Sequence, residues 1–130
     1  MRYYIATSLS RAEEHNKLRD ILNELGHELT YDWTVHGNVR NESSSDIAEV
    51  AEAEVNAVAD AHVVIVLLPG GRGTHTELGV ALGREIRVII VGDIELGFFS
   101  SDDRTCAFYH HGLCEWVYTI GEAATKMGRL

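Results

Sequence analysis

The sequence predicts an α/β protein, a three-layer sandwich in which helices cover both faces of a five-stranded parallel sheet. Residues 63–68 are continuously apolar, as expected for a central strand buried on both faces. Segments with a helical repeat of apolar residues alternate with short β-branched or aromatic segments. Because each connection between parallel strands crosses one face of the sheet, this alternation predicts a flavodoxin-like or Rossmann-like arrangement.

The first half of the chain contributes two expected strands and two expected helices. Residues 3–6 read as the first strand, and Ser10 with Glu13 has the spacing of a capping box at the start of a helix that Gly26 ends. A second strand is expected over 28–33 and a loop over 35–45. Ser45 or Asp46 can cap the next helix. The expected inward faces of the two helices are Leu18, Ile21, Leu22 and Leu25 in the first, and Ile47, Ala51, Val55 and Val58 in the second.

The second half continues the alternation after the apolar strand 63–68. A Pro-Gly turn at 69–73 leads into a short helix, capped by Thr74 or Thr76 and ending at Gly83. The remaining expected elements are a buried strand over 86–91, a long polar loop over 92–107, a last strand over 116–118 and a closing helix over 120–127.

The composition fits one globular domain over residues 1–130. Hydrophobic residues make up 45% of the chain and charged residues 24%, which is enough apolar material for a core. The 11 basic and 20 acidic residues give a formal charge of −9, which repels nucleic acid polymers and anionic membranes. A small anion can still bind at a helix start, so nucleotides remain candidates.

The cysteines and the hydropathy pattern predict a cytoplasmic protein. Cys106 and Cys114 form no C-x-x-C pattern, and we expect two reduced thiols. The beginning of the sequence shows no signal-peptide pattern, and the longest apolar run is too short to cross a bilayer.

Function is expected where the parallel strands end, in the loops after residue 6 and after residue 68. The second loop is glycine-rich and opens a helix, so Gly71, Gly73 and Thr74 can approach an anion closely, with Arg72 adding charge. The same residues allow a purely structural interpretation, because Thr74 and Glu77 have the spacing of a capping box. A dinucleotide fingerprint is a poorer fit, since Thr76 stands where its third glycine belongs.

Several segments of the sequence together resemble the nucleoside 2-deoxyribosyltransferase family. They are the segments 3–8, 25–29 and 59–62, and above all the G-T-x-x-E-L-G-x-A-L-G stretch at 73–83. The family contains transferases that exchange nucleobases and hydrolases that cleave the N-glycosidic bond of deoxynucleoside monophosphates. The resemblance implies no cofactor and a small-molecule nucleoside or nucleotide substrate.

The resemblance also implies roles for individual residues. Glu77 matches the nucleophile that attacks C1′ and forms a covalent glycosyl-enzyme, a two-step displacement that also needs a proton donor for the leaving base. We expect the helix start and Arg72 to keep the pKa of Glu77 low. The family's partner acid has no clear match, and either Asp60 or His62 can take its place, or the role is vacant.

Two further expectations follow from the same resemblance. Tyr4 matches a strand tyrosine that orients the nucleophile, although a tyrosine there can also be a core residue. Ser8 falls in the loop that meets the sugar or a 5′-phosphate. Family active sites are often completed by a neighbouring subunit, so we expect a homo-oligomer, a dimer or larger, with residues 108–111 or 116–118 as candidate contributors.

The histidines do not make a convincing metal site. His75, His110 and His111 lack the spacing of a zinc or carboxylate-assisted site, so no metal is expected. Trp33 can stack on a base or simply pack at a strand end. The leading hypothesis is an N-glycosidic-bond enzyme, and the alternative is a nucleotide-binding or sensing module of the same fold without chemistry.

Overall fold

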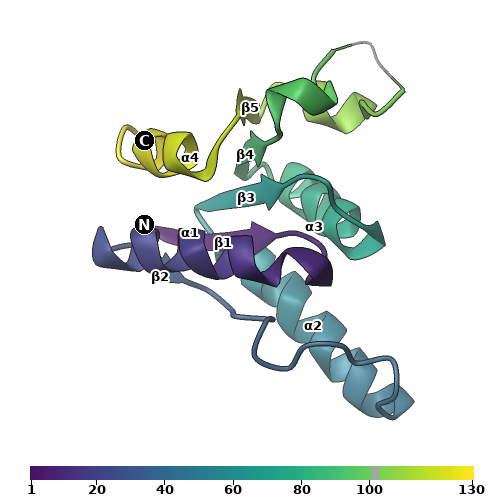
Figure 1. Cartoon of the computed structure of the whole chain (residues 1–130). Helices are drawn as coiled ribbons and strands as arrows, with labels where there is room; N and C mark the ends of the chain where they lie inside the picture. Colours follow the sequence, from purple (N-terminus) through teal and green to yellow (C-terminus); the bar gives the residue numbers. More distant parts are fainter. Residues whose placement is uncertain (101–102) are drawn as a thin grey trace.

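The structure is a computed structural model that describes residues 1–100 and 103–130. Strands and helices alternate along the chain (Figure 1). The elements are β1 (Arg2–Ala6), α1 (Ala12–Glu24), β2 (Glu28–Leu29), α2 (Ser44–Asp60), β3 (Val63–Leu67), α3 (Arg72–Gly83), β4 (Arg87–Val91), β5 (Cys114–Val117) and α4 (Ile120–Met127), with 3₁₀ turns η1 (Leu9–Arg11), η2 (Ile94–Leu96) and η3 (Ala107–His110).

The five strands form one parallel sheet in the order β2-β1-β3-β4-β5. All five residues of β3 are buried, which confirms the expected central strand. The chain runs outward to β2 on one side of β1 and to β4 and β5 on the other side of β3. The strand order therefore reverses between β1 and β3, and this reversal is where such sheets bind ligands.

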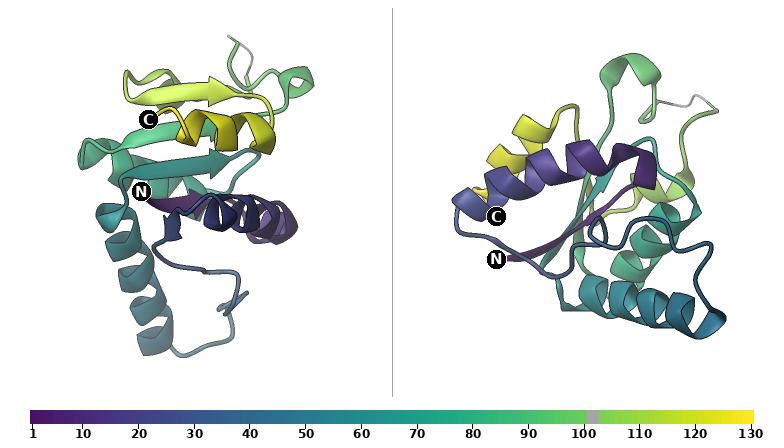
Figure 2. Two further views of the ribbon diagram at one scale, coloured as in Figure 1. Left: turned by 90° about the vertical axis from the view of Figure 1, so that its left-hand side faces the viewer. Right: turned by 60° about the horizontal axis from the view of Figure 1, so that its bottom comes forward.

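Helices cover both faces of the sheet, which confirms the predicted three layers (Figure 2). One core lies between the sheet and helices α1 and α4, and includes Leu18, Leu22 and Met127. The other lies between the sheet and helices α2 and α3, and includes Val58 and Leu78. The first turns of α2 extend beyond the sheet (Figure 2).

The two ends of α1 differ in how well the sequence predicts them. Gly26 ends the helix as expected, with φ of +89° and a hydrogen bond from the His27 N–H to the Leu22 carbonyl. The predicted capping box is wrong, because η1 precedes the helix and Ser10 bonds to Ser8 instead. The inward face is also rotated, since Ile21 and Leu25 are exposed and the fully buried His15 joins Leu18 and Leu22.

The segment after α1 departs furthest from prediction. The second strand has only two residues, because the chain then turns so that Trp33 enters the core and donates its Nε1–H to the Ile5 carbonyl at 2.9 Å. The cap of α2 is Ser43, which accepts from the Asp46 N–H, rather than Ser45 or Asp46. Of the predicted inward face of α2, Val58 is buried and Ile47 is partly buried, whereas Ala51 and Val55 are exposed.

The C-terminal half follows the prediction more closely. Helix α4 has the expected bounds, with Thr119 as its cap. The last strand begins two residues earlier than expected, and η2 and η3 interrupt the expected loop, of which residues 101–102 lie outside the described residues. Cys106 and Cys114 are both free. Within residues 1–100 and 103–130, no helix is long and apolar enough to cross a membrane.

The rotated face of α1 can be tested with two neighbouring substitutions. Leu22→Ala empties a fully buried site, and we expect it to lower the free energy of unfolding by about 2–5 kcal/mol. Ile21→Ala removes a side chain that is 37% exposed, and we expect a loss under about 1 kcal/mol. Urea denaturation of both variants measures the difference. Equal losses would contradict the observed rotation.

Candidate active site

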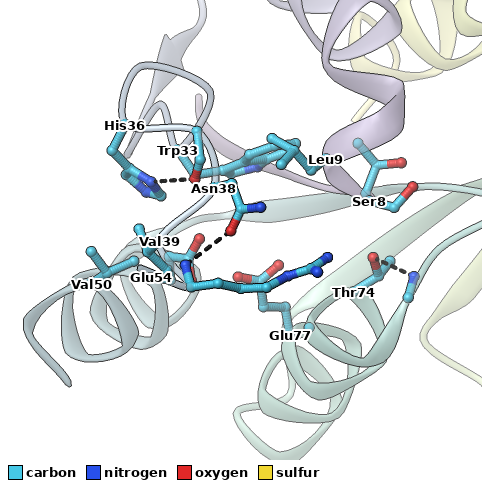
Figure 3. Close-up of a pocket in the computed structure, with 15 residues that line it drawn as sticks. Ser8, Leu9, Trp33, His36, Asn38, Val39, Val50, Glu54, Thr74 and Glu77 are labelled. Atoms are coloured by element: carbon cyan, nitrogen blue, oxygen red, sulfur yellow. Dashed lines mark hydrogen bonds between the residues drawn. The ribbon is translucent and has the colours of Figure 1, made fainter. Parts of the chain in front are cut away.

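A cavity of about 320 Å³ opens at the carboxyl ends of β1 and β3, where the strand order reverses (Figure 3). Its walls come from the turn after β1, the loop between β2 and α2, helix α2, and the start of α3. The lining residues are Thr7, Ser8, Leu9, Trp33, His36, Gly37, Asn38, Val39, Arg40, Val50, Glu54, Gly71, Gly73, Thr74 and Glu77.

Glu77 is the carboxyl group at the centre of this cavity. It lies in α3, which begins directly after the glycine-rich turn, and its side chain is almost completely buried. The Tyr4 hydroxyl donates a hydrogen bond to Glu77 Oε2 at 2.7 Å. The capping interpretation of Glu77 is therefore wrong. Thr74, in the first turn of α3, accepts from the Gly71 N–H, and Glu77 is left free to face Tyr4.

The pKa of Glu77 is raised, whereas the sequence analysis expected it to be low. Burial raises it from 4.5 to about 8, the hydrogen bond from Tyr4 lowers it, and the charge of Glu54 raises it further. Arg72 does not counter this effect, because its side chain is exposed and does not line the cavity. The expectation that Arg72 and the helix start keep this pKa low is therefore wrong, since removal from water outweighs them.

Tyr4 is fully buried in β1 and has a pKa raised far above its ordinary value. Burial is the largest cause, and the neighbouring charge of Glu77 adds to it. The hydroxyl therefore keeps its proton at any pH at which the protein functions. It remains a hydrogen-bond donor to Glu77, and this donor favours the ionised carboxylate.

Glu54 is a second carboxyl group in the cavity, and the sequence analysis missed it. It projects from α2 one turn after Val50, which also lines the cavity. Burial raises the pKa of Glu54, and its charge acts on both Glu77 and Tyr4. The residues Val50, Glu54 and Val58 recur at helical spacing, but a glutamate within an apolar stripe reads as solvent-exposed unless the helix face is known.

Asp60 and His62 do not reach the cavity. His62 precedes β3, and its Nδ1 accepts from the Arg2 N–H at the start of β1. The Asp60 carbonyl accepts from Arg2 Nε at the same edge. Strands of five residues span about 16 Å, and the cavity lies at their other end. The structure therefore separates both candidates from Glu77.

The predicted sugar- or phosphate-binding residues are brought together, apart from Arg72. Ser8 follows β1 and lies across the cavity from Gly71, Gly73 and Thr74 at the start of α3. Figure 3 shows Ser8 and Thr74 toward one end of the cavity, with Glu77 between them and Asn38 and His36 toward the other. The N–H groups of the first helical turn have no acceptor within the helix and can bind an anion.

The loop before α2 supplies cavity residues that no sequence pattern singled out. His36, Asn38 and Arg40 all line the cavity, and the Asn38 side chain accepts from the Arg40 N–H at 2.9 Å. Trp33 is 5% exposed and hydrogen-bonded to Ile5, so most of its ring packs in the core. Arg40 is the one lysine or arginine among the lining residues, all of which are described.

The histidines considered as metal ligands have other partners. His75 lies between the Gly71 carbonyl and the Tyr109 hydroxyl, each at 2.7 Å. His110 bonds to Thr105, and His111 accepts from the Leu113 N–H. In the described part of the chain, no three His, Cys, Asp or Glu side chains are grouped to hold a metal ion.

Comparison with known proteins identifies a family. The model of the family described as nucleoside 2-deoxyribosyltransferase matches residues 3–114. No curated protein matches the sequence significantly.

Three solved structures share the fold. They are the CMP N-glycosidase of Clostridium botulinum (TM-score 0.64, 18% identity, 100% of both chains), a 2-deoxyribosyltransferase of Bacillus psychrosaccharolyticus (0.74, 14%, 95% of this chain and 90% of that one) and a conserved protein of Enterococcus faecalis V583 (0.66, 17%, 100% and 99%).

The raised pKa of Glu77 predicts a specific pH dependence of stability. Between pH 4.5 and about 8 the unfolded chain has released this proton and the folded protein still holds it, so the free energy of unfolding falls as pH rises. Glu77→Gln removes this titration. We expect the variant to gain on the wild type by up to a few kcal/mol between pH 5 and pH 8, since one pKa unit corresponds to about 1.4 kcal/mol.

Urea denaturation across that pH range measures the effect. The exposed Glu24→Gln serves as the control and should follow the wild type. If Glu77→Gln shows the same pH slope as the wild type, the carboxyl of Glu77 does not retain its proton in the folded protein.

Proposed function

The chain belongs to the nucleoside 2-deoxyribosyltransferase family, and from that premise we propose that Glu77 is the nucleophile of its reaction and Glu54 the proton donor. The protein is an enzyme that catalyses cleavage or transfer at the N-glycosidic bond of nucleosides or nucleotides. The observation that carries the proposal is the buried Tyr4 to Glu77 hydrogen bond in a cavity that also holds a second, half-buried carboxyl group, that of Glu54.

In the first step, the Glu77 carboxylate attacks C1′ of the sugar while the bond from C1′ to the base nitrogen breaks. The electron pair of that bond leaves with the base, and a proton from the Glu54 carboxyl neutralises it. A covalent glycosyl ester on Glu77 remains. Tyr4 orients the attacking oxygen through its hydrogen bond and favours the ionised form of Glu77.

In the second step, an acceptor attacks C1′ and releases Glu77. The Glu54 carboxylate removes a proton from that acceptor and returns to its starting form. Water as the acceptor makes the enzyme a hydrolase, and a second base makes it a transferase. The two carboxyl groups thus need opposite protonation states, and of the two it is Glu77 that accepts the hydrogen bond of the Tyr4 hydroxyl.

The substrate is a small nucleoside or nucleoside 5′-monophosphate. Ser8 and the turn of Gly71, Gly73 and Thr74 line one end of the cavity and offer hydroxyl and backbone N–H groups to the sugar or phosphate. The base then lies toward His36, Asn38 and Glu54, where the proton donor is.

We further propose that the enzyme is cytoplasmic and works as a homo-oligomer. Both cysteines are free, as reduced thiols would be. Phe108 is 62% exposed and Trp116 is 39% exposed, so the two segments considered for a neighbouring active site present aromatic side chains at the surface.

Release of free base tests the roles of the carboxyl groups. We expect the wild type to release or exchange base from at least one member of a panel of ribo- and deoxyribonucleosides and their 5′-monophosphates, assayed by chromatography. Glu77→Gln should lower the rate at least about 10³-fold, as removal of a nucleophile does. Glu54→Gln should lower it about 10²- to 10⁴-fold through loss of the proton donor.

Asp60→Asn is the matched control, because Asp60 lies outside the cavity and should be dispensable. Undiminished turnover in Glu77→Gln would refute its role as nucleophile. Tight nucleotide binding by the wild type without any base release would favour a binding module instead.

The hydrogen bond of Tyr4 predicts a shift in the pH profile. Because this bond lowers the pKa of Glu77, its loss in Tyr4→Phe should raise that pKa above about 8. We expect kcat/KM of the wild type to rise with pH toward about 8, and the rising limb of Tyr4→Phe to move to higher pH with a lower maximum. The control is Tyr3→Phe, whose hydroxyl bonds to Asn23 on the other face of the sheet. An unmoved limb in Tyr4→Phe would show that the hydroxyl does not act on Glu77.

A further inference from the structure

His36 has one ring nitrogen that is satisfied and one that is not. The residue lies in the loop between β2 and α2, with its ring 5.9 Å from that of Tyr31. Its Nδ1 is 2.9 Å from the Gly37 carbonyl. A carbonyl oxygen can only accept, so Nδ1 carries the hydrogen, and in the neutral ring Nε2 carries a lone pair.

The Nε2 atom is buried and lacks a hydrogen-bond partner among the described residues. A buried acceptor without a donor is destabilising and rare in native structures, which calls for a specific explanation. A donor from the protein would have to be a group that is close by and has a hydrogen to give.

Glu54 meets both requirements. It lines the same cavity as His36. A positive charge on the His36 ring lowers the pKa of Glu54, so the pairing requires the neutral ring. Figure 3 shows both at the same end of the cavity. Burial favours the protonated form of Glu54, and in the described part of the chain its carboxyl makes no hydrogen bond. A protonated carboxyl offers one O–H donor.

We propose that His36 is the positioning residue of Glu54, with Nε2 accepting a hydrogen bond from the protonated carboxyl, so that the proton stays on Glu54 while Glu77 ionises. The inference rests on the proposed function, in which Glu54 is the proton donor. A hydrogen bond to the neutral form of an acid stabilises that form, as the Tyr4 hydroxyl does for the ionised form of Glu77.

The pairing also serves the second step. Once Glu54 has given its proton to the base, its carboxylate faces the lone pair of Nε2, an arrangement that favours recovery of a proton from the acceptor. The other charged or titratable groups near His36 are Arg40 in the same cavity, Tyr31, and the acidic residues of an adjoining cavity, Glu42, Asp46 and Glu49. None of them forms a hydrogen bond or ion pair with His36 within the described ranges.

Two substrates with different leaving groups distinguish a positioning role of His36 from a purely structural role. A nucleobase must be protonated to leave, whereas 4-nitrophenolate leaves without a proton. We expect His36→Phe to lower kcat about 10- to 100-fold with a nucleoside or nucleotide substrate, and only a few-fold with the matching 4-nitrophenyl glycoside. His36→Gln, whose amide oxygen can accept, should recover most of the loss. His62→Phe is the matched control, because His62 is exposed at the opposite edge of the sheet.

Two kinetic results would overturn the proposal. One is an equal loss with both leaving groups in His36→Phe, which indicates a general disturbance of the cavity. The other is a further loss when His36→Phe is added to Glu54→Gln, because a residue that acts through Glu54 has no effect once that acid is gone.

Nitrogen-15 NMR of the histidine rings tests the pairing without turnover. We expect the Nδ1–H tautomer of His36 near pH 7, with an Nε2 shift that moves toward the value of a free acceptor in Glu54→Leu. An Nε2–H tautomer, a doubly protonated ring, or an Nε2 shift that ignores Glu54→Leu would refute the pairing. If the proposed function alone fails, base release is absent while the Glu54-dependent Nε2 signal remains.

Discussion

The buried hydrogen bond from Tyr4 to Glu77 is the contact around which the site is organised. It joins β1 to α3 across the point where the strand order reverses, so it exists only if both strands and the turn after β3 are in place. The glycine-rich turn starts α3 at Arg72, and Glu77 therefore falls on the helix face that meets the sheet. Apolar strands beneath it exclude water, and this exclusion gives the carboxyl its unusual pKa.

The site keeps two carboxyl groups in a setting that disfavours the charge of either. Burial raises the pKa of both Glu54 and Glu77, and the charge of Glu54 raises the pKa of Glu77 further. Such a pair reduces the stability of the folded protein at neutral pH, yet it supplies one group that can donate a proton and one that can attack. The hydrogen-bonding neighbours of the two groups differ, with the Tyr4 donor beside Glu77 and the proposed His36 acceptor near Glu54. In our account this difference places the proton on Glu54.

The sequence predicts the central strand and the residues in the resembling segments better than it predicts the orientation of α2 and the length of β2. The central strand was recognisable because six apolar residues in succession have few other uses. Glu77 and Tyr4 were singled out because the segments that contain them resemble the family. Glu54 was not recognisable, because its role depends on which face of α2 meets the sheet, and many alanines make that face ambiguous. The short β2 depends on the Trp33 ring entering the core, a tertiary contact that local propensity does not encode.

The most direct test is to trap the glycosyl-enzyme. A substrate analogue with fluorine at C2′ destabilises the positive charge that develops on the sugar, which slows breakdown of the covalent intermediate. Peptide mass spectrometry after a short incubation then locates the added sugar. Our account predicts the adduct on the peptide that contains Glu77, and its absence in Glu77→Gln. An adduct on Glu54, or full turnover of the natural substrate by Glu77→Gln, would contradict it.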